Sequence, residues 1–196
     1  VNEAVVPATL TITANSLTLS AAPAADGGDD KSTIAAKAAS GAAGGVGVAG
    51  SVAIAVIDHD TDAGIRGTVV LSGGDLTITA GSALVSTVAA TPAKNGVTGD
   101  SVGVGISFGL TVLDVATSAF VADGVSVTGA RDATLTATSG TAAMTEARMG
   151  AAAPGGVAVT PAIAITLSNA VTSARVGTGL ELRVSRDLSV AAFQTA

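Results

Sequence analysis

The chain has 196 residues, of which 48% are hydrophobic but only 2% aromatic, and its formal net charge is −6. Charged residues make up 12%, too few for an intrinsically disordered chain, and no basic patch interleaved with aromatic residues points to nucleic-acid binding. The sequence has no cysteine, which excludes disulfides, thiolate metal sites and cysteine nucleophiles.

The first unit of the chain begins with an alternating apolar and polar strand at 9–14, typical of a half-buried strand. A stretch rich in proline, glycine and aspartate at 21–32 reads as a loop insertion, and an alanine-rich segment follows at 33–39. Alanine favours helix, but the counterparts of this segment at 85–90 and 142–149 are mixed, so we assign all three to strands.

The middle unit predicts five strands and a loop. The strands are expected at 75–80, 84–90, 102–113, 117–121 and 124–129, with a loop over 91–96 and 98–100. The opening strand is expected again at 132–137 and 187–192, and the fourth strand at 61–65 and 172–176.

Three long alternating stretches, at 45–58, 101–114 and 156–169, align without gaps. Their first residues lie 56 and then 55 residues apart, and a fixed period of this size indicates units that bury apolar surface against their neighbours. We therefore predict an all-β fold, a parallel β-solenoid (β-helix) of about three 55-residue repeats. The predicted repeats are approximately 9–74, 75–131 and 132–186, with the start of a fourth at 187–196.

The two faces of the long strand differ in side-chain size. One face carries large aliphatic residues such as Val48, Val104 and Val159, which we expect to stack in buried ladders. The other face carries small residues such as Gly47, Gly103 and Ser107. Because so many glycines weaken a strand unless a neighbour needs the space, we expect this face to pack closely inside the coil, although it could also meet another copy.

The motifs DLTITA at 75–80, GVGVAGSVAIAVID at 45–58 and the following TDAGI at 61–65 or TSAFV at 117–121 resemble the repeats of giant bacterial filamentous adhesins. The grouping they resemble is the LktA-like (leukotoxin-type) filamentous adhesin family, over nearly the whole chain. The resemblance implies a β-solenoid in a long secreted or surface-anchored stalk, and it carries over no catalytic residue.

Alternating acids at Asp58, Asp60 and Asp62 suggest a calcium loop, since three carboxylates can converge on a hard cation. The glycine expected next is Ala63, and the position of the bidentate acid is Val69. A simple turn, with Asp58 bonding its own backbone, is the alternative. The acidic stretch at 26–30 is a second candidate for weak calcium binding, against a solvated loop. We expect no cofactor, with calcium as the alternative.

Outward threonines form a second candidate site. If the opening strands stack, Thr11 and Thr13 align with Thr77 and Thr79, and these with Thr134 and Thr136. Such a double ladder of hydroxyls is typical of ice-binding surfaces, but threonine is also simply a good residue for the outer face of a strand.

No arrangement of residues predicts catalysis. His59 is the only histidine, Glu146 and Glu181 are isolated, and no nucleophile is placed by a recognisable motif. We expect a structural or adhesive segment of a very large protein, or alternatively a module that recognises ice, glycan or calcium. Its expected partners are neighbouring repeats of the same polypeptide or identical chains end to end, together with a host or cell-surface ligand.

The expected location is extracellular or on the bacterial surface, because an acidic surface with few cations is typical of such proteins. The chain opens at Val1 without a secretion signal, and we expect it to be a piece of a longer polypeptide. No run reaches the roughly 18 apolar residues of a spanning helix, so we expect no membrane insertion.

Overall fold

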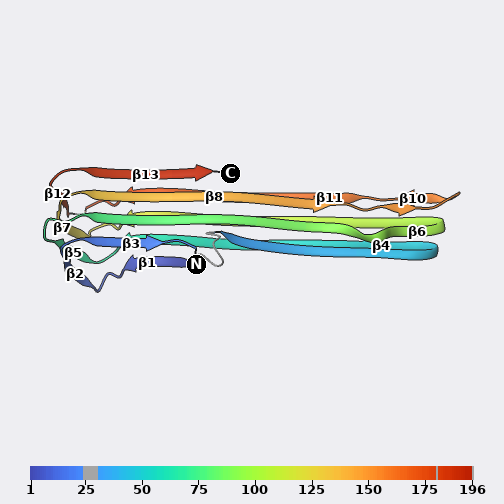
Figure 1. Cartoon of the computed structure of the whole chain (residues 1–196), viewed down its shortest axis with the longest axis horizontal. Helices are drawn as coiled ribbons and strands as arrows, with labels where there is room; N and C mark the ends of the chain where they lie inside the picture. Colours follow the sequence, from blue (N-terminus) through green and yellow to red (C-terminus); the bar gives the residue numbers. More distant parts are fainter. Residues whose placement is uncertain (24–30, 180, 196) are drawn as a thin grey trace.

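A computed structural model describes residues 1–23, 31–179 and 181–195. This part of the chain is all-β, without a helix, and its strands pair in parallel (Figure 1). The strands are β1 (Asn2–Val6), β2 (Thr11–Ala14), β3 (Leu17–Ala21), β4 (Ser32–Ile65), β5 (Thr68–Leu71), β6 (Leu76–Val121), β7 (Ser126–Ala130), β8 (Ala133–Ala147), β9 (Ala151–Ala152), β10 (Val157–Val159), β11 (Ala162–Val176), β12 (Glu181–Val184) and β13 (Leu188–Thr195).

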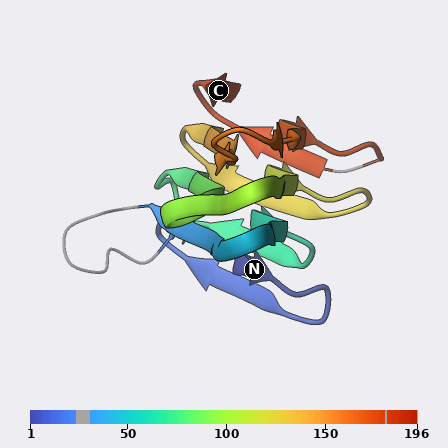
Figure 2. The ribbon, with the colours of Figure 1, turned by 90° about the vertical axis from the view of Figure 1, so that its right-hand side faces the viewer.

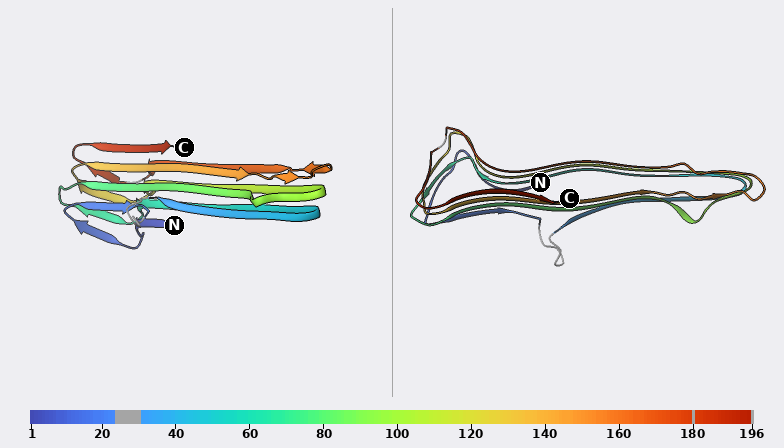
Figure 3. Two further views of the ribbon diagram at one scale, coloured as in Figure 1. Left: turned by 45° about the vertical axis from the view of Figure 1, so that its right-hand side comes forward. Right: turned by 90° about the horizontal axis from the view of Figure 1, so that it is seen from above.

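The strands lie in layers that are stacked one above another in the order of the sequence (Figure 2). We call residues 32–65 the lower layer, 76–121 the middle layer and 133–176 the upper layer. Within a layer the chain runs out along one wall, bends and returns along the other, so that each layer is long and flat (Figure 3). The outgoing walls are 32–43, 84–98 and 141–152, and the returning walls are 46–65, 102–121 and 157–176.

The predicted register between the long strands is confirmed. Val48 of β4 pairs with Val104 of β6, which in turn pairs with Val159 of β10. The pairing continues to Ile65 and Val121 between the lower and middle layers, and to Val176 in the upper layer. Residues one period apart are therefore direct neighbours in a parallel sheet.

The predicted loop at 91–96 and 98–100 lies within β6 rather than outside the strands. The register shifts here, because Ser40 pairs with Pro92 while Ala42 pairs with Val97. The middle layer thus carries extra residues just before its bend, and the parallel pairing resumes beyond them.

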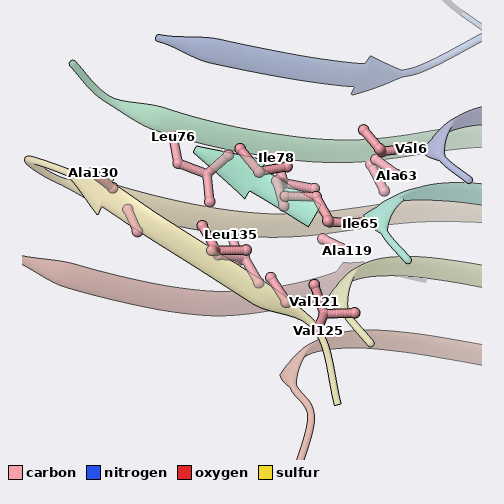
Figure 4. Packing of buried hydrophobic residues seen from close by; sticks show 14 of the residues in the cluster. Val6, Ala63, Ile65, Leu76, Ile78, Ala119, Val121, Val125, Ala130 and Leu135 are labelled. Atoms are coloured by element: carbon pink, nitrogen blue, oxygen red, sulfur yellow. The ribbon is translucent and has the colours of Figure 1, made fainter. Parts of the chain in front are cut away.

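A second, four-stranded sheet in the order β12-β7-β5-β2 stands at one end of the layers, on the left of Figure 1. Its inward side chains, such as Val69 and Val127, belong to one hydrophobic cluster with residues of the larger sheet. Ile65, Ile78 and Leu135 of that sheet are seen in Figure 4. This end is wide enough for large aliphatic residues, and it holds the main hydrophobic core.

The alignment of the first opening strand was wrong. Thr11 and Ile12 of β2 pair with Thr68 and Val69 of β5, so β2 belongs to the four-stranded sheet. The counterpart of Leu76 is Leu17 of β3. The sequences LTITA at 10–14 and LTLSA at 17–21 both fit the same strand pattern, and local similarity does not distinguish them. The first repeat in this register starts near Leu17, not near residue 9.

The long part of the lower and middle layers is arranged inside out relative to the expectation, whereas residues 157–169 of the upper layer are exposed on both faces. Val48, Ile54 and Val56 are 64%, 51% and 73% exposed, so the predicted burial of the aliphatic ladders was wrong. The small residues between them, among them Ala53 and Ala55, are buried and face Leu84 and Val88 of the opposite wall. Close packing of the small-residue face inside the layer is therefore confirmed.

The walls approach too closely for larger side chains. A Cβ on Gly47 would lie 2.5 Å from the Thr98 carbonyl oxygen, and one on Gly105 would lie 2.5 Å from Met149 Cγ. Real Cβ atoms essentially never come so near another atom. The glycines therefore set the thickness of the layer, and the bulky residues of the returning wall are left on its outer side.

Candidate functional surfaces

Hydroxyl groups connect the walls and the layers in the long part of the fold, and those of Ser51 and Ser107 are buried. Ser107 Oγ donates to the Arg148 carbonyl oxygen of the opposite wall at 2.8 Å and lies 2.7 Å from Ser51 Oγ. Since its only proton goes to Arg148, the proton between the two serines comes from Ser51. Thr145 Oγ1 likewise lies 2.7 Å from both Thr111 Oγ1 and Thr166 Oγ1. These groups satisfy one another and are occupied structurally.

The acidic row lies on a strand, not in a loop or a turn. Asp58, Asp60 and Asp62 are alternate residues of β4, on the outer side of the returning wall. Two oxygens on one calcium ion lie at most about 5 Å apart, because each is about 2.3–2.6 Å from the ion, whereas Asp58 and Asp62 are separated by about 13 Å along an extended strand. Among the described residues no group of three or more acidic or histidine side chains is placed to hold a metal ion. The second calcium candidate, at 26–30, lies outside the described residues.

The neighbours of the acidic row differ from layer to layer. Asp58 pairs in register with Asp114, whose Oδ1 accepts a hydrogen bond of 3.0 Å from Asn169 Nδ2. Burial raises the pKa of Asp62, an effect that Arg66 opposes and that Asp60 reinforces. Of the three acids only Asp58 has an acidic counterpart in the next layer, because Asp60 and Asp62 pair with Ala116 and Ser118.

Four of the six candidate threonines form the expected ladder. Thr77 pairs with Thr134 and Thr79 with Thr136, and all four are half-buried on the outer side of β6 and β8. The lower strand continues the ladder with Thr18 and Ser20 of β3, not with Thr11 and Thr13. The sequence contained this signal at 17–21, but the earlier match at 10–14 concealed it.

Thr11 and Thr13 lie on another surface. They belong to β2, where Thr11 pairs with Thr68 and Thr13 with Val70. Both threonines are exposed. They therefore do not extend the two columns of hydroxyls on β3, β6 and β8.

His59 points into the lower layer, between buried Ile57 and buried Thr61. Its buried Nε2 has no hydrogen-bond partner in the described part of the chain. Burial lowers its pKa, the positive charge of the α-amino group adds to this effect, and Asp60 opposes it. The side chain is thus a half-buried group that points into the lower layer, and its pKa is lowered by this burial. Glu146 and Glu181 are paired with Arg148 and Arg183, respectively.

An aromatic ring joins three layers near the wide end of the fold. Phe120 is buried, and the guanidinium carbons of Arg66 and Arg175 lie 5.1 and 5.4 Å from its ring centroid. The two arginines belong to the layers below and above, since Gly64 and Arg175 are the register partners of Phe120. Cations over the face of a ring are attracted by its quadrupole, so this cluster stabilises the stack.

The largest candidate surface was not foreseen as one. We call the outward-pointing alternate residues of 46–56, 102–112 and 157–167 the aliphatic face. Every residue of this set is Val, Ile, Leu, Phe, Gly or Pro. The sequence contained a sign of this surface in the glycines on the other side of the same strands. Where a strand needs glycine, a second wall packs closely against it, so the large residues must point outward.

No family model matches the chain, and no match was found among curated proteins or solved structures. The described residues contain no helix long and apolar enough to cross a membrane.

Proposed function

We propose that the chain is a segment of a parallel β-solenoid that serves as a structural or adhesive stalk in a very large secreted or surface-anchored bacterial protein. The observation that carries this proposal is the register: residues 55 to 57 apart are direct parallel neighbours, as in Val48, Val104 and Val159. One period is one layer, so tandem repeats would extend the stack without a new kind of contact.

The bonds between layers support a mechanical role. Equivalent positions of successive layers bond to each other, as Ser51 bonds to Ser107 and Asn169 to Asp114. Arg131 donates to both carboxylate oxygens of Asp75 in the layer below, at 3.0 and 2.7 Å. Together with the backbone ladders over whole walls, these contacts resist bending and separation of the layers.

A role without catalysis is supported by the use made of the polar residues. The histidine faces the interior, Glu146 and Glu181 pair with neighbouring arginines, and Ser51 and Thr111 bond to Ser107 and Thr145. Four other buried hydroxyls, on Ser40, Thr61, Ser86 and Thr141, have no partner among the described residues. The outer surfaces include the threonine columns and an extended row of aliphatic side chains, which suit contact with other surfaces.

The stalk proposal is tested by inserting further copies of residues 76–132 in tandem. Each inserted copy is expected to lengthen the stack by one strand spacing, about 4.8 Å, so that four copies add about 19 Å in small-angle X-ray scattering. The cross-section is expected to stay unchanged. Growth in another direction, or inserted copies that proteases remove, would contradict the proposal. Protease accessibility on intact cells that make the full polypeptide tests the surface location.

The threonine columns favour recognition of an ordered surface as a second candidate function. Thr77, Thr79, Thr134 and Thr136 stand on the corners of a flat grid set by the strand spacings. If this grid binds ice, the chain shows thermal hysteresis, and Thr79→Lys with Thr136→Lys abolishes it. Thr11→Lys, on the other sheet, is the matched control. Absence of hysteresis in the unaltered chain rejects ice as the ligand.

A further inference from the structure

The two outer walls of the long layers differ in polarity. On the outgoing walls Lys37, Ala89 and Glu146 stack in register, and exposed Arg148 lies nearby. The aliphatic face on the returning walls has no charged or hydrogen-bonding side chain over the same length. The long part of the fold is therefore a slab with one mixed polar side and one apolar side.

The aliphatic face is large for a surface left in water. It spans eleven residues along three strands, or about 35 Å by 14 Å, which gives roughly 500 Å² on a flat measure. Soluble monomers rarely expose contiguous apolar patches of more than a few hundred Å², and such patches mark contact sites. The exposure is greatest in the lower and upper layers, where Val46 is 64% and Leu167 is 57% exposed, while the middle-layer residues other than Ile106 are half-buried between their neighbours.

We propose that the aliphatic face is the contact surface between two copies of this chain, packed side by side and face to face. The face is flat and its side chains stand on a regular grid, so a second copy presents a grid of the same spacings. Aliphatic rows of that kind interdigitate as in sheet-on-sheet packing. Two such faces bury roughly 1,000 Å² in total, the size at which specific protein interfaces begin.

The charges around the face favour a second copy over a membrane. Carboxylates border it at both ends, with Asp58 and Asp114 toward the wide end and exposed Asp100 at the bend. These groups repel an anionic lipid surface. Between two copies they oppose association only weakly, and salt screens them. The contact is therefore expected to tighten as the salt concentration rises, which is the opposite of a charge-driven complex.

Lysine substitutions test the contact. Ile54→Lys with Ile165→Lys places charges in the middle of the face, at positions where lysine finds solvent in the monomer because both residues are exposed. Sedimentation velocity over a range of concentrations is expected to show dimers of the unaltered chain and at least about tenfold weaker association of the variant. Met144→Lys, 58% exposed on the opposite wall, is the matched control and is expected to leave the dimer intact.

Cross-linking tests the same contact without a charge. The chain has no cysteine, so Ile106→Cys introduces a single thiol. This residue lies at the centre of the face, and when the two faces overlap fully the two-fold axis passes through that centre and brings the residue near its own copy. A short bismaleimide is expected to link Ile106→Cys chains in pairs but not Met144→Cys chains.

Several results would overturn the inference. These are a monomer at millimolar concentration in high salt, association that the lysine pair does not weaken, or equal cross-linking of the two cysteine variants. Co-sedimentation with neutral phosphatidylcholine vesicles, without self-association, would assign the face to lipid instead. None of these outcomes bears on the length of tandem arrays, so the stalk proposal is tested separately.

Discussion

The ring of Phe120 lies directly against Gly64 of the layer below. A Cβ added to Gly64 would lie 2.7 Å from Phe120 Cε1 and Cζ, and also 2.7 Å from the Phe120 carbonyl oxygen. The ring is held from two sides by Arg66 and Arg175, so it has little freedom to move away.

Gly64→Ala is therefore expected to destabilise the fold by about 1–3 kcal/mol, because an added methyl group overpacks this site. Urea unfolding followed by circular dichroism measures the change. Gly45→Ala is the control, since a Cβ there meets no atom within 4 Å. Equal urea midpoints for the two variants would show that the Phe120 ring can move to make room for the added methyl group.

The serine pair predicts unequal effects of two similar substitutions. Ser107→Ala removes the hydroxyl that bonds both Ser51 and the Arg148 carbonyl, so it leaves two buried groups unpaired. It is expected to cost about 1–3 kcal/mol of unfolding free energy. Ser51→Ala leaves the bond from Ser107 to Arg148 in place and is expected to cost less. Denaturant titration of both variants and of the double variant measures their coupling; equal losses would contradict the proposed donor order.

His59 predicts a pH dependence with a definite sign. Its pKa in the folded chain lies below the ordinary value of 6.5, so the unfolded chain binds the proton first as the pH falls. The contribution of neutral His59 to the free energy of unfolding is therefore complete above about pH 6.5, and it is lost as the pH drops toward the lower pKa of the folded chain. Asp62 has the opposite effect on stability: its pKa is raised above 3.8 in the folded chain, so the folded chain binds this proton first and gains stability as the pH falls toward 3.8.

His59→Val isolates this contribution, because valine occupies the register position in the next layer, Val115. The variant is expected to lose less stability than the unaltered chain between about pH 7 and pH 5. Thermal unfolding at several pH values measures the difference. Parallel curves for the two proteins would show that His59 is not protonated differently in the folded and unfolded states.

The acidic row predicts a weak response to calcium. Because the three carboxylates follow an extended strand, calcium is expected to raise the melting temperature no more than magnesium does. Isothermal titration calorimetry provides the direct measurement. A saturable site that Asp60→Asn abolishes and Asp114→Asn retains would instead establish the row as a calcium site.

The repeat and the register of the long strands could be predicted because both depend on matching residues at a fixed spacing. Val48, Val104 and Val159 share a column whether their side chains point in or out. Alternation separates two faces but does not identify the inner one. The usual expectation that large aliphatic residues are buried failed here because the walls come so close that Gly47 and Gly105 have no room for a Cβ.

The first layer could not be aligned for a different reason. Two nearly equal pentapeptides at 10–14 and 17–21 compete for one strand position, and the pattern contains nothing that ranks them. The choice depends on the parallel neighbours, since Leu17 pairs with Leu76 while Thr11 pairs with Thr68. The site predictions inherited this ambiguity, and it displaced Thr11 and Thr13 from the threonine ladder.

The glycine-lined gap between the walls also determines how the chain tolerates change. A single methyl group added at Gly47 meets the backbone of the opposite wall and forces the two walls apart, and the displacement passes to the neighbouring layer through continuous backbone bonds. Outward positions such as Val56 carry no such constraint. Variation in length, charge and shape can therefore accumulate on the exterior while the interior keeps its thickness, which makes the long limb a constant frame for interchangeable outer surfaces.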